Sequence, residues 1–444
     1  MAGVPQRAAS LNTDAGRAKR QQSAPGFFTP YLYLLPLVSL AYSLLLPLEV
    51  RVSVAGQTLY PYRIVCILIV PWFLRRVAAK EFRWDWIDGS ILLAAFWMIV
   101  SFIVRYGPLD GILRGGSLAF DLAMPYLAAK LTIRTKNDFR LLLILFLPGL
   151  ILTGFFLMLE SVSHRVIVRA IAADIFGSRA IYEEGSASGE VVFGNETRLG
   201  LMRASGPFAH PILAGLFFGS FLPLVLGSSF RGWPRYGGLL AALFAVFSVS
   251  SAAFLSLMLG SAFTIYDRLQ RVVEFANWRM LLLGLVLISF GIHLASENGF
   301  FRFLIRYTLD PQTGFYRLLI WEYGLLSVAN HPWFGIGFDR YEALPWMVAS
   351  VDTHWLMLAI RHGLITPFAL FIGSAAVVYK LAIRATGSTR EHDGIFYVGL
   401  AISLAVLMLL AFTVAYFGAI QTWFCIVIGC CAGLVTSADR PVRK

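Results

Sequence analysis

The stretch FRLLLILFLPGLILTGFFLMLE, residues 139–160, decides the fold class. At about 1.5 Å per residue, a helix of this length crosses the roughly 30 Å hydrocarbon core of a bilayer. Comparable apolar runs recur from residue 31 to residue 436, and 58% of the 444 residues are hydrophobic, well above the share in soluble domains. The sequence therefore predicts an all-α fold, a polytopic transmembrane helix bundle.

Charges in the loops set the expected number and orientation of the spans. In the first half of the chain, Arg and Lys gather in alternate connections, which places those connections in the cytoplasm. Residues 237–266 are long enough for one tilted span or two short ones. A turn near Ser248–Ser251 keeps the later basic loops in the cytoplasm, so we expect two spans there and about 12 in all. The other expected spans lie near residues 31–49, 61–79, 88–105, 112–132, 139–160, 207–229, 278–296, 363–382, 394–415 and 418–436.

The same pattern divides the chain into tails, one membrane domain and long loops. Residues 1–26 are polar and are expected to form a disordered cytoplasmic tail, and residues 437–444 a second cytoplasmic tail. Residues 27–436 are expected to form a single transmembrane domain. Two long loops, at about 161–206 and 297–353, then lie outside the cytoplasm, and because the cytoplasmic connections are short, the chemistry is expected in these loops.

Composition excludes several other classes. The net charge of +12 does not indicate nucleic acid, because the basic residues are scattered through short loops and tails. The four cysteines lie in apolar runs, without the paired spacing of a metal site or a disulfide framework. No acidic triad or His and Cys cluster is spaced like a metal site, so neither a metal nor a cofactor is expected.

One ion pair is expected within the membrane. Arg114 and Asp121 are seven residues apart in the fourth apolar run, near residues 112–132, and are expected to pair there.

The external loops contain arginine and no lysine. A guanidinium presents a planar fork of donors that matches phosphate or carboxylate oxygens, so an anionic ligand is indicated. Lipid phosphates and the acidic residues of the loops are the alternative partners. Arg203 opens the string RASGPFAHPILAG at the mouth of a span, and Arg302 and Arg306 lie in the second loop. His210 either lines the same pocket as Arg203 or is satisfied by backbone at the start of a helix.

Two further strings carry polar residues at the membrane boundary. In RLLIWEYGLLSVANHPWFGIGF, Arg317 and Trp321 are four residues apart and share one face of a short helix, which ends before a turn rich in Pro and Gly. The alternative is an interfacial helix with a snorkelling arginine. In VDTHWLMLAIRHGLIT, Asp352, His354 and Arg361 cluster at the entry to a span, where ionisable groups are costly and indicate a functional site.

In their order and spacing these strings resemble the bacterial O-antigen ligase and O-antigen polymerase superfamily. The resemblance covers roughly residues 200–375 and is carried by RASGPFAHP, RLLIW, HPWFGIG and a closing string that ends Gly–Leu–Ile. The closing motif of the family is His–Asn, with a glycine eleven residues after the histidine. Counting back from Gly363 puts Asp352 and Thr353 in those places and His354 two positions late, so the identity of the general base stays open between Asp352 and His354.

The resemblance implies a substrate, glycan repeat units on undecaprenyl pyrophosphate at the outer face of the inner membrane. Displacing a lipid pyrophosphate builds negative charge that fixed arginines can stabilise without a metal, and a His or a carboxylate can deprotonate the acceptor hydroxyl in an inverting transfer. Arg203 and Arg317, with Asp352 or His354, are therefore the expected catalytic residues. The expected substrate-binding residues are His210, Arg302, Arg306, Trp321, His331 and Arg361.

The expected function is that of an inner-membrane glycosyltransferase. It polymerises O-antigen or exopolysaccharide repeat units, or it ligates finished glycan to an acceptor, as an O-antigen ligase does on lipid A core. The alternatives are a non-enzymatic polysaccharide exporter or flippase, which would need charges along a central cavity, and a structural partner in an assembly complex, in which the external arginines would be dispensable. The expected partners are the lipid-linked glycan, the lipid bilayer and other polysaccharide assembly proteins, with no nucleic acid.

Overall fold

The computed structural model describes residues 29–54, 57–177, 197–273, 277–295, 311–347, 350–386 and 391–437. The predicted tail at residues 1–26 and the candidate residues Arg302 and Arg306 lie outside the described residues, as do residues 438–444 of the second tail. Backbone contacts separate residues 1–33 from residues 34–444 as two units. The first unit contributes only the beginning of the 3-10 helix η1 (Thr29–Leu34) to the described residues.

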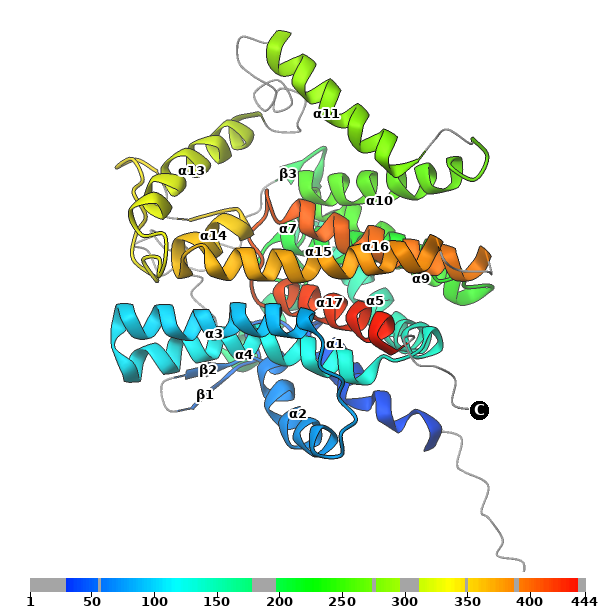
Figure 1. The fold of residues 1–444 in the computed structure, drawn as a ribbon, viewed down its shortest axis with the longest axis horizontal. Coiled ribbons are helices and arrows are strands. Elements are labelled where there is room, and N and C mark those ends of the chain that lie inside the picture. Colours follow the sequence, from blue (N-terminus) through cyan, green and yellow to red (C-terminus); the bar gives the residue numbers. More distant parts are fainter. Residues whose placement is uncertain are drawn as a thin grey trace, which may run out of the picture. The chain divides into compact units, whose positions relative to one another are not determined.

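The described part of residues 34–444 is helical apart from two short hairpins (Figure 1). Strand β1 (Val52–Val54) pairs antiparallel with β2 (Gln57–Leu59), and β3 (Thr197–Arg198) pairs antiparallel with β4 (Leu201–Met202). The helices are α1 (Leu35–Ser43), α2 (Pro61–Ala78), α3 (Trp86–Tyr106), α4 (Pro108–Thr132), α5 (Lys136–Ser163), α6 (Val168–Phe176), α7 (Pro211–Gly219), α8 (Phe221–Gly227), α9 (Trp233–Leu243), the 3-10 helix η2 (Phe244–Ser248), α10 (Ser251–Leu269), α11 (Trp278–Ala295), α13 (Pro311–Asn330), α14 (His354–His362), α15 (Ile365–Thr386), α16 (Glu391–Leu410) and α17 (Ala419–Ser437).

Five of the described helices are long and apolar enough to cross a bilayer: α3, α5, α15, residues Asp393–Leu410 of α16, and α17. The all-α, multi-span prediction is thus confirmed, whereas the count of about 12 spans is not. Polar residues and breaks explain the difference. Helix α4 carries Arg114, Asp121 and Lys130, and the predicted span at 207–229 is divided at Ser220 into α7 and α8.

The break expected near Ser248–Ser251 is present. Helix η2 ends where Val249 adopts the left-handed conformation, with φ of 42°. Ser250 then caps α10, because its hydroxyl accepts a hydrogen bond from the Ala253 N–H at 3.1 Å. A Cβ atom on Gly215 of α7 would overlap the Ser248 hydroxyl, so α7 packs directly against this break.

Small residues allow α17 to lie close to α4. A Cβ atom on Gly429 or on Gly433 would overlap backbone oxygens of α4 or of Ile133, the residue that follows it. Such glycines let helix backbones approach where lipid provides no hydrophobic driving force. Helix α17 also contacts α7, α15 and α16, and Trp423 on α17 donates a hydrogen bond to Ser220 at 2.9 Å, so α17 lies at the centre of the packed helices (Figure 1).

Charged side chains inside the bundle are paired between helices. The Lys130 ammonium on α4 lies 2.6 and 2.7 Å from the two carboxylate oxygens of Asp88 on α3, and both side chains are buried. The expected Arg114–Asp121 pair is wrong. Asp121 instead accepts a hydrogen bond from Arg63 Nε at 2.9 Å, while Arg114 lies over the ring of Tyr106, because seven residues along a helix separate two side chains by about 10 Å.

Replacing Asp88 by alanine should strongly destabilise the protein, because it leaves the Lys130 ammonium buried without its counter-charge. We expect a loss of about 3–5 kcal/mol in the free energy of unfolding. The matched control is Asp393→Ala, which removes a partly exposed ion pair with Lys136 and should cost under about 1 kcal/mol. Unfolding titrations in mixed detergent micelles measure both, and equal losses for the two variants would contradict the prediction.

Candidate functional site

The turn that follows α13 is attached to the C-terminal end of α14 by backbone hydrogen bonds. The Ile336 N–H donates to the Ile360 carbonyl at 2.8 Å, and the Gly337 N–H donates to the Arg361 carbonyl at 3.1 Å. On the other side, the Leu364 N–H donates to Pro332 at 2.8 Å. The string HPWFGIG and the string that closes on Gly–Leu–Ile therefore form one interlocked unit.

Glycine is required at the points of closest approach in this unit. Gly335, Gly337 and Gly363 have φ values of 63°, 67° and 78°, in the left-handed region that other residues rarely adopt. A Cβ atom on Gly363 would overlap the Trp333 carbonyl, and one on Gly335 would overlap the Ile360 carbonyl. The spacing of the glycines in the sequence thus reflects two backbones in direct contact.

Helix α3 supports the same turn from a third direction. The Trp97 indole N–H donates to the Trp333 carbonyl at 2.8 Å. The Tyr106 hydroxyl accepts a hydrogen bond from the Phe338 N–H at 2.5 Å. Residues 331–338 are therefore held between the end of α14 and the length of α3.

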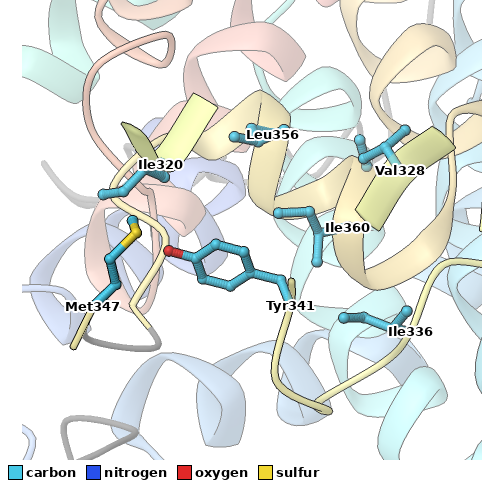
Figure 2. Close-up of a cluster of buried hydrophobic side chains, with 8 residues drawn as sticks. Ile320, Val328, Ile336, Tyr341, Met347, Leu356 and Ile360 are labelled. Atoms are coloured by element: carbon cyan, nitrogen blue, oxygen red, sulfur yellow. The ribbon is translucent and has the colours of Figure 1, made fainter. Parts of the chain in front are cut away.

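A hydrophobic cluster packs α13 against α14 and the intervening loop (Figure 2). Its buried members are Ile320, Val328, Ile336, Tyr341, Met347, Leu356, Ala359 and Ile360. At about 25 cal/mol per Å² of apolar surface, burying such side chains stabilises the contact between the two helices. The cluster fixes α13, which carries Arg317, relative to residues 350–353, which lead into α14.

Arg317 and Asp352 interact electrostatically across this junction. Burial raises the pKa of the Asp352 carboxyl, and the positive charge of Arg317 opposes the rise. Two of the residues expected to be catalytic, one from each string, therefore influence each other electrostatically. A carboxylate with a raised pKa beside an arginine is suited to accept a proton near a bound anion.

Tyr341 is a feature of the site that sequence reasoning missed. The side chain is buried, and burial raises the pKa of its hydroxyl to about 12, with Tyr316 and Asp352 adding to the rise. Among the described residues the hydroxyl has no hydrogen-bond partner, and it points between Ile320 and Met347 (Figure 2). A lone tyrosine in a long loop carries no periodic or spacing signal, so only the fold reveals its position beside Asp352.

His354 lies in a different environment from Asp352, although the two are separated by one residue. Its side chain is 1% exposed, and its ring stacks on Tyr416 with centroids 5.0 Å apart. The ring Nδ1 accepts a hydrogen bond from the Tyr416 N–H at 3.4 Å, which assigns the ring proton to Nε2. Burial, together with the positive charge of Arg361, lowers the pKa of His354 to about 3, so the imidazole is neutral at pH 7.

Arg203 is positioned by a separate set of elements. It is 9% exposed and lies in the segment between β4 and α7. The Ala204 N–H donates to the Phe247 carbonyl of η2 at 3.3 Å, and the Met202 carbonyl accepts a hydrogen bond from the Ser161 hydroxyl of α5 at 2.8 Å. Helices α5 and η2 therefore hold Arg203, whereas α13 and α14 hold Arg317 and Asp352.

The predicted substrate-binding residues occupy several environments. His210 caps α7, since its Nδ1 accepts a hydrogen bond from the Ile212 N–H at 3.2 Å, which matches the backbone alternative. Trp321 stacks on Phe412 and donates to its carbonyl at 3.4 Å. His331, directly after α13, is exposed.

Arg361 lies beside residues 331–338, the glycine turn that follows α13. Its guanidinium is 5.2 Å from the centre of the Phe338 ring, a cation–π distance. The turn and α3 together thus fix where this charge sits.

In the described ranges, no three side chains of His, Cys, Asp or Glu gather in a way that could hold a metal ion.

Replacing Gly363 by alanine should disrupt the interlocked turn, because the new methyl group would meet the Trp333 carbonyl at a φ of 78°. We expect a loss of about 1–3 kcal/mol in the free energy of unfolding. Gly116→Ala is the control, since a Cβ atom there has nothing within 4 Å and alanine favours the helix. Unfolding titrations test the pair, and equal stability of the two variants would refute the steric argument.

The comparisons with known proteins agree with this geometry. The family model described as O-Antigen ligase matches residues 236–371, and comparison with curated proteins finds no match. The matched range contains α13, the glycine turn and α14, and so includes Arg317 and Asp352. This match confirms, over residues 236–371, the predicted resemblance to the O-antigen ligase and polymerase superfamily.

Proposed function

We propose that this protein is a bacterial inner-membrane glycosyltransferase that transfers glycan from undecaprenyl pyrophosphate to a hydroxyl of an acceptor glycan. The family match supports a function of the ligase or polymerase type. The observation that carries the chemistry is the electrostatic interaction of Arg317 with the half-buried carboxyl of Asp352 at the junction of α13 and α14. A cation for a departing diphosphate and a base for an incoming hydroxyl are the two groups that this transfer needs.

In the proposed reaction, the acceptor hydroxyl attacks the anomeric carbon from the face opposite the pyrophosphate. The new bond joins the acceptor oxygen to the anomeric carbon, while the bond from that carbon to the pyrophosphate oxygen breaks. The hydroxyl proton passes to Asp352, and the lipid pyrophosphate leaves with the bonding electron pair. Arg317 and Arg203 stabilise the negative charge on the leaving group, and the configuration of the sugar inverts.

Asp352 is a better candidate than His354 for the base. The His354 ring is enclosed by Tyr416, Trp355 and Phe424, and a base with its pKa lowered to about 3 binds a proton weakly at pH 7. Asp352 lies beside Arg317, and its pKa is raised toward the working pH. We therefore propose that Asp352 removes the proton and that His354 holds the start of α14 in place.

The proposed membrane arrangement keeps about 12 spans, cytoplasmic termini and external loops at 161–206 and 297–353. Helix α6 supports an interfacial position for the first loop. Its residues Ile171, Ile175 and Phe176 are exposed, while Arg169 is buried and pairs with Glu49. A short helix with an open apolar side is suited to lie in the interface between headgroups and hydrocarbon.

Polymerisation is the form of transfer that we favour. Asp352 and Thr353 stand where the family motif has His–Asn, and this departure argues against a ligase. The donor, a lipid-linked glycan, is the same in both cases. The acceptor distinguishes them, since a polymerase extends a lipid-linked chain and a ligase attaches the chain to a finished core.

Gel analysis of surface glycan from a deletion strain tests the function. Capped lipid with a single repeat unit indicates a polymerase, and unattached long glycan on its carrier indicates a ligase.

In strains that carry variants, Arg203→Ala and Arg317→Ala should each abolish long-chain glycan while the protein still inserts, because a lost transition-state charge contact costs about 100-fold or more. The matched control is Arg165→Ala, an exposed arginine of the first loop, which should leave the glycan unchanged. Wild-type glycan from both arginine variants would refute the enzyme hypothesis.

The pH dependence should identify the base. A general base works only when deprotonated, so the rate should fall as the pH drops through the pKa of Asp352, which burial places above the ordinary value of about 3.9. The Arg317→Gln variant lacks the positive charge that opposes the rise, so the pKa of Asp352 should be higher still. The acidic limb of the pH–rate profile, measured on the residual activity, should therefore move to higher pH. Asp352→Asn should lower the rate by about 100- to 10,000-fold.

The corresponding control is His354→Gln, which should reduce stability without moving the acidic limb. Rate measurements across pH on purified variants provide the comparison. An acidic limb that disappears in His354→Gln and persists in Asp352→Asn would assign the base to His354 instead.

A further inference from the structure

A buried carboxylate at the end of α5 holds two loop segments together. Glu160 is fully buried, and its Oε1 accepts hydrogen bonds from the backbone N–H groups of Ile167 and Val168, each at 2.9 Å. Its Oε2 accepts a third hydrogen bond, from the Gly206 N–H at 2.9 Å. One side chain thereby joins the start of α6 to the turn that follows Arg203.

The next residue of α5 completes the attachment. The Ser161 hydroxyl, which is also buried, donates to the Met202 carbonyl at 2.8 Å. Met202 and Gly206 lie on either side of Arg203, so consecutive side chains of α5 fix the backbone before and after this arginine. Gly206 has a φ of 54°, so the chain turns sharply at the point where Glu160 binds it.

A carboxylate is the group that this position requires. An ionised carboxyl offers acceptors on both oxygens, and N–H bonds to a charged acceptor are roughly twice as strong as neutral ones. Glutamine would place an NH₂ donor at one of the two positions. Since Oε1 already serves two N–H groups, that donor would face the Gly206 N–H, and the turn after Arg203 would lose its anchor.

We infer that Glu160 is a positioning residue for Arg203 in the glycosyl transfer proposed above, on which this inference rests. Glu160 acts through the backbone of residues 203–206, the RASG segment, and keeps the Arg203 guanidinium where the charge of the departing diphosphate develops. Fixed charges stabilise a transition state because they need no reorganisation during the reaction, and a displacement of 1 Å can cost about 100-fold in rate. The effect should therefore fall on kcat more than on KM.

The test compares Glu160→Gln with wild type, using purified protein and the lipid-linked glycan that accumulates in the deletion strain. The expected result is a decrease in kcat of about 10- to 100-fold, with KM for the lipid-linked donor changed by less than about 3-fold. A wild-type kcat in Glu160→Gln overturns the inference. So does a decrease confined to KM.

Glu49→Gln is the matched control. Glu49 is likewise a buried carboxylate, it binds Arg169 of α6 at 2.9 and 2.6 Å, and it has no part in the RASG segment. This variant should lose at least as much stability as Glu160→Gln while keeping kcat within about 3-fold of wild type, because it perturbs α6 alone. Equal losses of kcat in both would reduce Glu160 to a structural role and overturn the inference.

A double-mutant cycle with Arg203→Lys tests whether Glu160 acts through Arg203. Glu160→Gln should lower kcat much less in the Arg203→Lys background than in wild type, because coupled residues are not additive. Equal fold-changes in the two backgrounds contradict the inference. If Glu160→Gln does not fold, Ser161→Ala replaces it in the cycle, with an expected decrease of about 3- to 10-fold in wild type and a smaller one in Arg203→Lys.

Arg203→Ala separates this inference from the function it rests on. Wild-type activity in Arg203→Ala refutes the proposed role of Arg203, and the inference falls with it. Inactive Arg203→Ala beside fully active Glu160→Gln overturns only the positioning role.

Discussion

The contact between the glycine turn and the end of α14 is the constraint on which the rest of the site depends. Two stretches of backbone meet there with no side chain between them, at Gly335 and Gly363. Three backbone hydrogen bonds close the contact, and α3 supports it through Trp97. Because the turn follows α13 directly, this contact fixes α13 relative to α14, and so determines where Arg317 lies relative to Asp352.

Carboxyl groups in the described part of the chain differ in how their charge is compensated. Asp88 lies against the Lys130 ammonium and Glu160 accepts three backbone N–H groups, so each carboxyl has its partners built into the structure. Asp352 differs, since burial raises its pKa against the opposing charge of Arg317. A carboxyl held by such partners stabilises the fold, whereas the raised pKa of Asp352 suits that carboxyl to accept a proton.

Hydropathy and charge predicted the features that depend on long runs of the chain: an all-α fold, several spans and the break near Ser248. The Pro and Gly residues predicted a turn after the helix that carries Arg317, but not that this turn meets the end of α14, because backbone contacts leave no periodic signal. The roles of Glu160 and His354 could not be predicted. Glu160 binds backbone N–H groups, which leave no mark in the sequence, and the His354 ring is enclosed by Tyr416, more than sixty positions further along. The span count was not confirmed, and charged residues such as Arg63 and Asp121, which pair with each other, make α2 and α4 more polar than the five apolar helices.

Helix α17 connects the two frameworks that carry the candidate catalytic residues. It contacts α7, which begins at Pro211, shortly after the RASG segment, and its Phe424 packs on the ring of His354 at the start of α14. A helix buried on nearly all sides, as α17 is, moves little relative to its neighbours. If Arg203 and Asp352 act on one substrate, their spacing must be set through such a shared element, since they belong to different loops. His354 then serves the reaction from inside the core, by fixing α14 on the helix that also supports α7.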